Sequence, residues 1–141
     1  MRRERSHRPT RHADERKIRD AIEAAEKRTS GKIFVTLSPD FWGEVHHGAR
    51  HAFGHLRGQH AMDESGILFF VVPWRRTLHV QGGAGIHSKV GQQFWDRVAH
   101  EVSQRINADD LTDGLIHGIE LAGDALAQHY PRSEGPDAAK A

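Results

Sequence analysis

"GILFFVV", residues 66–72, is a run of apolar side chains on both of its alternating faces. A strand with one face in water alternates apolar and polar residues, whereas a strand covered on both faces is a continuous apolar run. Strands of the second kind lie in the middle of a sheet that carries helices on each side. We therefore expect residues 66–72 to be the central strand of a layered α/β protein.

Two other segments are expected to pair with this strand. Residues 73–76, "PWRR", are few enough to form a hairpin turn, which returns residues 77–81 as an antiparallel neighbour. Residues 32–37 are rich in β-branched and aromatic side chains, and the turn-forming sequence "SPD" follows them. The predicted sheet is therefore small and mixed.

Helical periodicity marks four segments around these strands, where apolar residues recur every three or four positions. The recurring residues are Ile18, Ala21, Ile22 and Ala25, then Ala49, Ala52, Phe53 and Leu56, then Val90, Phe94, Val98 and Val102, and finally Leu115, Ile119, Ala122 and Leu126. The expected fold is a three-layer α/β/α sandwich with element order α-β-α-β-β-α-α. Its strand–helix–strand crossover should be right-handed.

The length of 141 residues fits one domain. We expect a basic, flexible N-terminal arm over residues 1–10, a single domain over 11–131 and a disordered tail over 132–141. The first 17 residues carry seven Arg or Lys against three acids, without the apolar run of a signal peptide. A short arginine-rich arm is usually a solvated tail, and no nucleic-acid-binding motif accompanies it.

Cysteine is absent, and this excludes disulfides, thiolate catalysis and cysteine-ligated zinc. The absence fits a reducing compartment. The longest apolar run, residues 67–72, stops at Pro73, far short of the roughly 20 residues that cross a bilayer. We therefore expect a cytoplasmic protein with no membrane span and no nucleic-acid partner.

Four phrases of the sequence resemble the TPM domain family and occur in the family's order. They are "KIRDAIEAAEKRTSGKIFV" at 17–35, "ESGILFFVV" at 64–72, "GGAGIHSKVGQQFWDRV" at 82–98 and "GLIHGIELAGDALAQHYP" at 114–131. Together they cover most of the chain, and the likeness is greatest to the short, soluble bacterial branch of the family. The resemblance implies an α/β/α sandwich, a weak acid-phosphatase activity in plant relatives, and binding of divalent metals, calcium in particular, in some members.

Two acidic positions of the family pattern are replaced in this chain. The family writes an acid after "TSG", where this chain has Lys32, and it writes "GD" where this chain has Gly82-Gly83. Calcium takes about six to eight oxygen ligands, many of them from carboxylates. The two replacements should therefore weaken any calcium site here.

The glycine-rich segment at residues 80–90, "VQGGAGIHSKV", completes neither the G-x-G-x-x-G pattern nor a Walker loop. In one interpretation, backbone N–H groups from Gly83 to His87 bind an anion at the start of a helix. The candidate ligand-binding residues are then Gly82, Gly83, Gly85, His87 and Ser88. In the other interpretation, glycine permits a positive φ where a strand turns into a helix, and Ser88 or His87 caps that helix.

Histidine is abundant, with twelve residues in the chain. His47, His51 and His55 are spaced by four, so on a helix they form a stripe spanning roughly 80° and directed about 150° away from the apolar face. Imidazoles four residues apart can chelate zinc and similar metals, which makes these three the candidate metal ligands. Because a site needs further ligands and no H-E-x-x-H motif is present, exposed surface histidines are the alternative.

Asp40 follows the first predicted strand and is the candidate catalytic carboxylate, because ligands of open α/β sheets gather beyond strand ends. Trp74, Arg75 and Arg76 lie in the predicted hairpin, where they would form an exposed interaction patch. Trp95 belongs to a family phrase and is expected to be packed.

The leading functional hypothesis is a non-catalytic accessory or interaction module with a protein partner. The first alternative is a weak metal-dependent acid phosphatase that works at Asp40 and the glycine-rich segment. The second is a divalent-metal-binding protein that takes calcium or zinc.

Overall fold

The central strand of the sheet is β2 (Gly66–Val72), and all seven of its residues are buried. It pairs in parallel with β1 (Lys32–Leu37) and antiparallel with β3 (Thr77–Gly82), so the strand order is β1-β2-β3. Helices cover both faces of the sheet, and this is why β2 lacks the period-two alternation of a half-exposed strand. The predicted central strand and mixed sheet are confirmed.

The computed structural model describes residues 13–107 and 110–132, and this part of the chain contains five helices. They are α2 (Glu15–Glu26), α3 (Val45–Gly58), α4 (Ala84–Val90), α5 (Gln92–Asn107) and α6 (Leu111–His129), and a 3₁₀ turn, η2 (Pro73–Arg75), joins β2 to β3. The predicted arm over 1–10 and residues 133–141 of the predicted tail lie outside the described residues.

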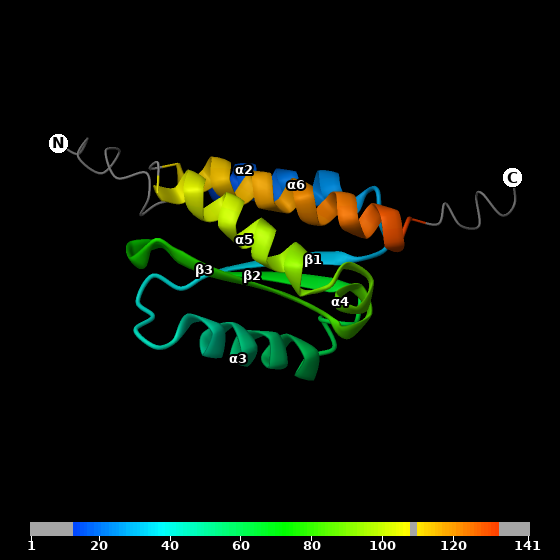
Figure 1. The fold of residues 1–141 in the computed structure, drawn as a ribbon, viewed down its shortest axis with the longest axis horizontal. Coiled ribbons are helices and arrows are strands. Elements are labelled where there is room, and N and C mark those ends of the chain that lie inside the picture. The colour runs from blue at the N-terminus through cyan, green and yellow to red at the C-terminus, as the bar shows by residue number, and fades with distance from the viewer. Residues whose placement is uncertain (1–12, 108–109, 133–141) are drawn as a thin grey trace, which may run out of the picture.

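The helices divide unequally between the two faces of the sheet. As Figure 1 shows, α2, α5 and α6 lie on one face and α3 lies alone on the other. This arrangement confirms the three-layer α/β/α sandwich. None of the helices in the described ranges combines the length and the apolar character that crossing a bilayer requires.

The elements follow the predicted order, but the third predicted helix is divided at Gly91. This glycine has a φ of 79°, and it separates α4 from α5. The apolar spacing from Val90 to Val102 continues across the break, since residues on both sides of it pack against the same core. Periodicity therefore does not reveal a single residue with a left-handed backbone.

The larger core lies between the sheet and the three-helix layer. Phe69, at the middle of β2, is fully buried there. A Cβ atom at Gly118 of α6 would lie 2.8 Å from Cε2 of Phe69 and 2.7 Å from Cγ2 of Val102 on α5. The glycine therefore lets α6 pack closely on both β2 and α5.

The opposite face of the sheet is covered by α3 alone. Ala49 of α3 packs with Phe70 and Val72 of β2 in a small buried cluster. One helix does not cover three strands, and an open groove remains on each side of it. The groove beside β1 has a volume of about 520 Å³ and the groove beside β3 about 390 Å³.

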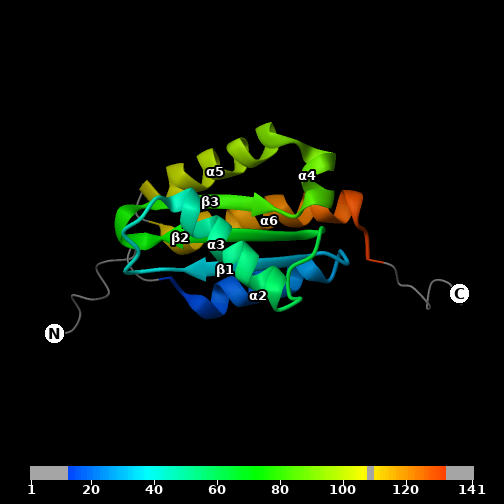
Figure 2. The same ribbon diagram turned by 90° about the horizontal axis from the view of Figure 1, so that it is seen from below.

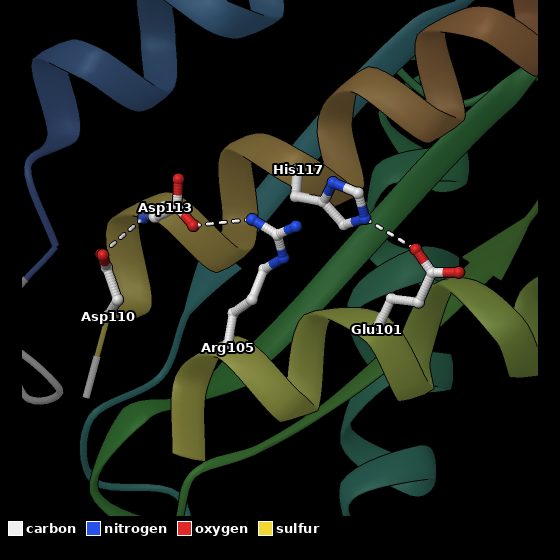
Figure 3. A network of polar contacts seen from close by, with 5 residues as sticks. All are labelled: Glu101, Arg105, Asp110, Asp113 and His117. Carbon is white, nitrogen blue, oxygen red and sulfur yellow. Dashed lines mark hydrogen bonds and ion pairs between the residues drawn. The ribbon is translucent and has the colours of Figure 1, made fainter. Parts of the chain in front are cut away.

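Polar contacts join α5 to α6 at the surface of the helical layer (Figure 3). Nε2 of His117 donates to Oε1 of Glu101 over 2.7 Å, and Arg105 pairs with Asp113 over 2.8 Å. Asp110 accepts the backbone N–H of Asp113 and caps α6. The hydrogen bond from His117 is the main reason that the pKa of Glu101 is lowered, and neighbouring positive charges add to it against the opposing effect of burial.

The shift at Glu101 predicts a pH-dependent contribution to stability. Because the pKa is lower in the folded protein than its ordinary value of 4.5, the contribution is present above that value and is lost as the pH falls through the folded pKa. The wild-type protein should therefore lose its stability advantage over Glu101→Gln as the pH falls below about 4.5 and through the lower folded pKa. Urea unfolding at a series of pH values measures this difference.

His117→Leu supplies the control for this measurement. In that background the effect of Glu101→Gln on stability should lose most of its pH dependence, because the main cause of the shift is gone. A difference between wild type and Glu101→Gln that stays constant across the range would contradict the assignment.

Candidate functional site

The glycine-rich segment turns from β3 into α4 without a positive φ. Gly83 is the N-cap of α4 with a φ of −65°, and among the described residues the only glycine with positive φ is Gly91. A Cβ atom at Gly83 would overlap the carbonyl oxygen of Asp63 and lie 2.7 Å from Cα of Glu64. The expectation of a positive φ was wrong, and glycine is needed here because two backbone segments touch.

Backbone N–H groups of this segment are bonded within the protein. The N–H of Gly83 donates to the carbonyl of Gly66 over 2.8 Å, and the N–H of Ile86 donates to the carbonyl of Glu64 over 2.9 Å. The N–H of His87 donates to the carbonyl of Gly83 over 2.9 Å. An anion bound at the start of α4 would need these N–H groups as donors. Because they already donate to backbone carbonyls, their bonds argue against a phosphate site here.

Neither His87 nor Ser88 caps α4. The hydroxyl of Ser88 donates to the carbonyl of Gly85 over 2.8 Å, and Nδ1 of His87 accepts the indole N–H of Trp95 over 2.9 Å. Trp95 itself is buried, as predicted. The carboxylate of Glu64 lies near the first turn of α4, where a Cβ atom at Gly85 would be 2.8 Å from its Oε1. The start of this helix therefore already faces a negative charge.

The two positions where the family pattern carries acids meet at one end of the sheet. Lys32 pairs with Gly66 at the start of β1, and Gly83 is bonded to that same Gly66. Both Ser65 donors, the backbone N–H and the hydroxyl, engage Oδ1 of Asp63 at 3.0 Å.

The hollow at this end of the sheet, about 370 Å³, is lined by Arg57 together with Asp63 and Glu64. Two carboxylates beside an arginine do not make up the roughly six to eight oxygen ligands that calcium takes. That the two replacements weaken calcium binding stays a prediction.

Asp40 lies at the opposite end of the sheet from the glycine-rich segment. It follows β1, whose last residue, Leu37, pairs with Val71, whereas Gly82 at the end of β3 pairs with Ile67. A strand of this length spans roughly 20 Å at about 3.3 Å per residue. The structure therefore does not bring together the two halves of the hypothesised phosphatase site.

The histidine stripe of α3 is exposed, as its helical spacing predicts. His47, His51 and His55 line the groove beside β1 together with Phe41 and Phe70. A different set of side chains, Glu44, His46 and His47, places its potential ligand atoms within 4.8 Å of one another, and among the described residues no other set of three does so. All three are exposed.

An aromatic cluster forms where the β1–α3 loop meets the β2–β3 hairpin. The rings of Trp42 and Trp74 lie 4.6 Å apart at an angle of 53°, and the side chains are 78% and 39% exposed. Nη1 of Arg75 donates to the carbonyl of Gly43 over 2.7 Å and ties the two loops together. We call Trp42, Trp74 and Arg75 the tryptophan tip.

Trp74 is exposed, as predicted, and Trp42 lies beside it although the predicted patch contained only Trp74, Arg75 and Arg76. The sequence signal for this neighbourhood was the strand–helix–strand crossover from residues 32–37 to residues 66–72, because such a crossover joins parallel strands. Parallel strands end at the same edge of a sheet, so the segments that follow them are neighbours. Arg76 adopts a left-handed backbone conformation with a φ of 52° at the end of the 3₁₀ turn.

Comparisons with known proteins agree with this fold. The sequence matches the TPM domain over residues 11–125. The NMR structure of the BA42 protein from the psychrophilic bacterium Bizionia argentinensis is similar, with 33% identity, a TM-score of 0.73, and coverage of 83% of this chain and 81% of that one.

A second solved structure, the N-terminal domain of the cg2496 protein from Corynebacterium glutamicum, shares the fold at 18% identity. Its TM-score is 0.60, and the alignment covers 78% of this chain and 69% of that one. No curated protein matches the sequence. The extent of the domain match, together with the similarity to BA42, shows that this chain belongs to the TPM domain family.

Proposed function

We propose that this TPM domain is a non-catalytic module that binds another protein through the tryptophan tip. The observation that carries the proposal is the exposure of Trp42 and Trp74. They are the exposed large hydrophobic side chains of the described part of the chain, and their tilted rings lie against each other at one end of the sheet. Exposed apolar clusters of this kind mark interaction sites.

The tip has the composition of a binding hot spot. Tryptophan and arginine are the residues that most often carry binding energy at protein interfaces. The hydrogen bond from Arg75 to the carbonyl of Gly43 holds the β1–α3 loop against the β2–β3 hairpin in the unbound protein. Such preorganisation lowers the entropy lost on binding.

The chemistry of the tip also indicates its partner. Two indole rings offer flat apolar surface, and the guanidinium of Arg75 adds positive charge beside them. A segment with an apolar or proline side chain flanked by acidic residues would complement both features. The separation of Asp40 from the glycine-rich segment supports a binding role over hydrolysis at those residues.

Affinity capture from native extract tests the proposal, with the wild-type chain and a Trp42→Ala/Trp74→Ala variant immobilised in parallel. The variant should bind a specifically captured partner at least about tenfold more weakly, because two hot-spot side chains are removed. Titration of the purified partner measures the two dissociation constants.

Arg19→Ala, an exposed change on α2, is the matched control and should bind the partner as the wild type does. Circular dichroism and urea unfolding should show that the double variant keeps its fold, since both side chains are exposed. Capture that is equal for the double variant and the wild type, or no partner in any sample, would count against the proposal.

A further inference from the structure

Three side chains that can ligate a metal gather at the start of α3. Glu44, His46 and His47 each offer one ligand atom, and the three atoms lie within 4.8 Å of one another. Figure 2 shows α3 crossing one face of the sheet, with its first turns near β3. All three side chains are exposed, so an ion in solution can reach them.

Glu44 occupies the N-cap position of α3 without capping the helix. An N-cap side chain usually accepts one of the free N–H groups of the first turn, but Glu44 makes no such bond. Its carboxylate lies against His46 instead, with Oε1 2.9 Å from Nδ1 of the imidazole. The contact between the two side chains is therefore not a by-product of helix capping.

The ring of His46 lies between two other imidazoles. Its centroid is 4.4 Å from that of His47 and 6.2 Å from that of His79 on β3. The register places His79 opposite Phe70, on the face of the sheet that α3 covers, and His79 lines the groove beside β3 together with His46. These neighbours and Glu44 restrict the orientation of His46, and a ligand that is already ordered loses less entropy on binding.

The distances in this cluster suit zinc. Zinc binds imidazole nitrogen and carboxylate oxygen at about 2.0–2.2 Å, and three protein ligands with one water form a common tetrahedral site. Two ligand atoms of such a tetrahedron are about 3.3 Å apart. The contact of 2.9 Å between Glu44 and His46 needs only a small opening to reach this separation. Rotation of the exposed His47 side chain would then supply the third ligand.

The donor set also selects the class of metal. Imidazole nitrogen suits zinc, copper and nickel, whereas calcium takes about six to eight oxygen ligands. Two imidazoles and one carboxylate do not supply an oxygen shell of that size. The acidic positions of the family pattern correspond to Lys32 and Gly83, which meet at the opposite end of the sheet from the hairpin and the start of α3. The cluster is therefore a different site.

Two positive features near the cluster oppose a cation. The N-terminal end of a helix carries the positive end of the helix dipole, and Arg50 follows His46 by one turn of α3. Arg50 is exposed, so water and salt screen its charge, and the carboxylate of Glu44 offsets part of the repulsion. We therefore expect an ion that exchanges with solution and not one that is required for folding.

We propose that Glu44, His46 and His47 form a site for one Zn²⁺ ion, with water in the remaining position. Glu44 lies next to Gly43, whose carbonyl accepts the hydrogen bond from Arg75 of the tryptophan tip. No residue of the tip supplies a ligand, so the zinc site does not rest on the proposed function.

The test is isothermal titration calorimetry of the full chain, without an affinity tag and stripped of metal, with zinc chloride in a buffer that does not chelate zinc. One ion should bind per chain. In a parallel NMR titration, the largest shifts should be at the amides of residues 44–47. Calcium chloride in about tenfold excess should not displace the zinc, because the site offers too few oxygen ligands.

His46→Gln is the decisive variant, and the double variant His51→Gln/His55→Gln is its matched control, because it removes two exposed imidazoles from the same helix. His46→Gln should raise the dissociation constant for zinc at least about tenfold, and the control should change it less than about twofold. Glu44→Gln removes no capping bond and should also weaken binding.

Circular dichroism should show that the variants keep the fold, since the replaced side chains are exposed. Absence of saturable binding at one ion per chain would overturn the proposal. Equal weakening by His46→Gln and by the control would overturn it as well, because zinc would then bind only adventitiously to surface histidines.

Discussion

Replacing Phe69 with alanine should lower the free energy of unfolding by about 3–5 kcal/mol. Phe69 is fully buried at the middle of β2, and its ring contacts α6 where Gly118 allows close approach. The substitution removes apolar surface from the core and leaves a cavity that the helical layer fills only in part. Urea unfolding monitored by circular dichroism measures the loss.

Phe34→Ala is the control for this prediction, since it makes the same chemical change on the adjacent strand β1. Phe34 is only partly buried, on the α3 side of the sheet, and its loss should be smaller. Because small domains have a net stability of about 5–15 kcal/mol, Phe69→Leu provides a milder variant if the alanine protein does not fold. Equal losses for Phe34→Ala and Phe69→Ala would contradict the central position of β2.

Gly83→Ala should destabilise the protein by about 3 kcal/mol or more, at or above the upper end of the range for overpacked cores. The added methyl group would overlap the carbonyl oxygen of Asp63 and lie 2.7 Å from both Cα and C of Glu64. These are backbone atoms, and hydrogen bonds from Gly83 and Ile86 hold the two segments together. No side-chain rotation relieves the overlap.

Gly54→Ala, in contrast, should increase the stability of the protein. Gly54 lies inside α3, and a Cβ atom there would meet nothing within 4 Å. Alanine should stabilise the helix by about 0.5–1 kcal/mol. Thermal and urea unfolding of both variants would check the pair of predictions. Wild-type stability in Gly83→Ala would show that the two segments are not in contact at this corner.

The Gly83 contact also bears on the acidic position of the family pattern. In the family pattern an acid occupies the position of Gly83, and any residue other than glycine must first displace the segment at Asp63 and Glu64. This chain therefore differs from the pattern in backbone packing as well as in charge. Restoring the acid by Gly83→Asp would meet the same overlap as Gly83→Ala.

The candidate sites were only partly predictable. Exposure of Trp74 and of the histidine stripe followed from a hairpin and from helical spacing, which are local properties of the chain. The partnership of Trp42 with Trp74 depends on parallel pairing of β1 and β2, and the groove at His79 depends on the register of β3 against β2. Neither pairing can be read from one segment alone.

Local patterns in the chain were enough to establish the central strand, the helices and the layered architecture, because burial imposes a period on each segment separately. The tertiary structure alone established that Asp40 is remote from the glycine-rich segment, that Trp95 donates to Nδ1 of His87, and that a groove stays open beside β3. These features arise from strand direction, register and contacts between distant segments. A linear pattern of apolar and polar residues does not contain that information.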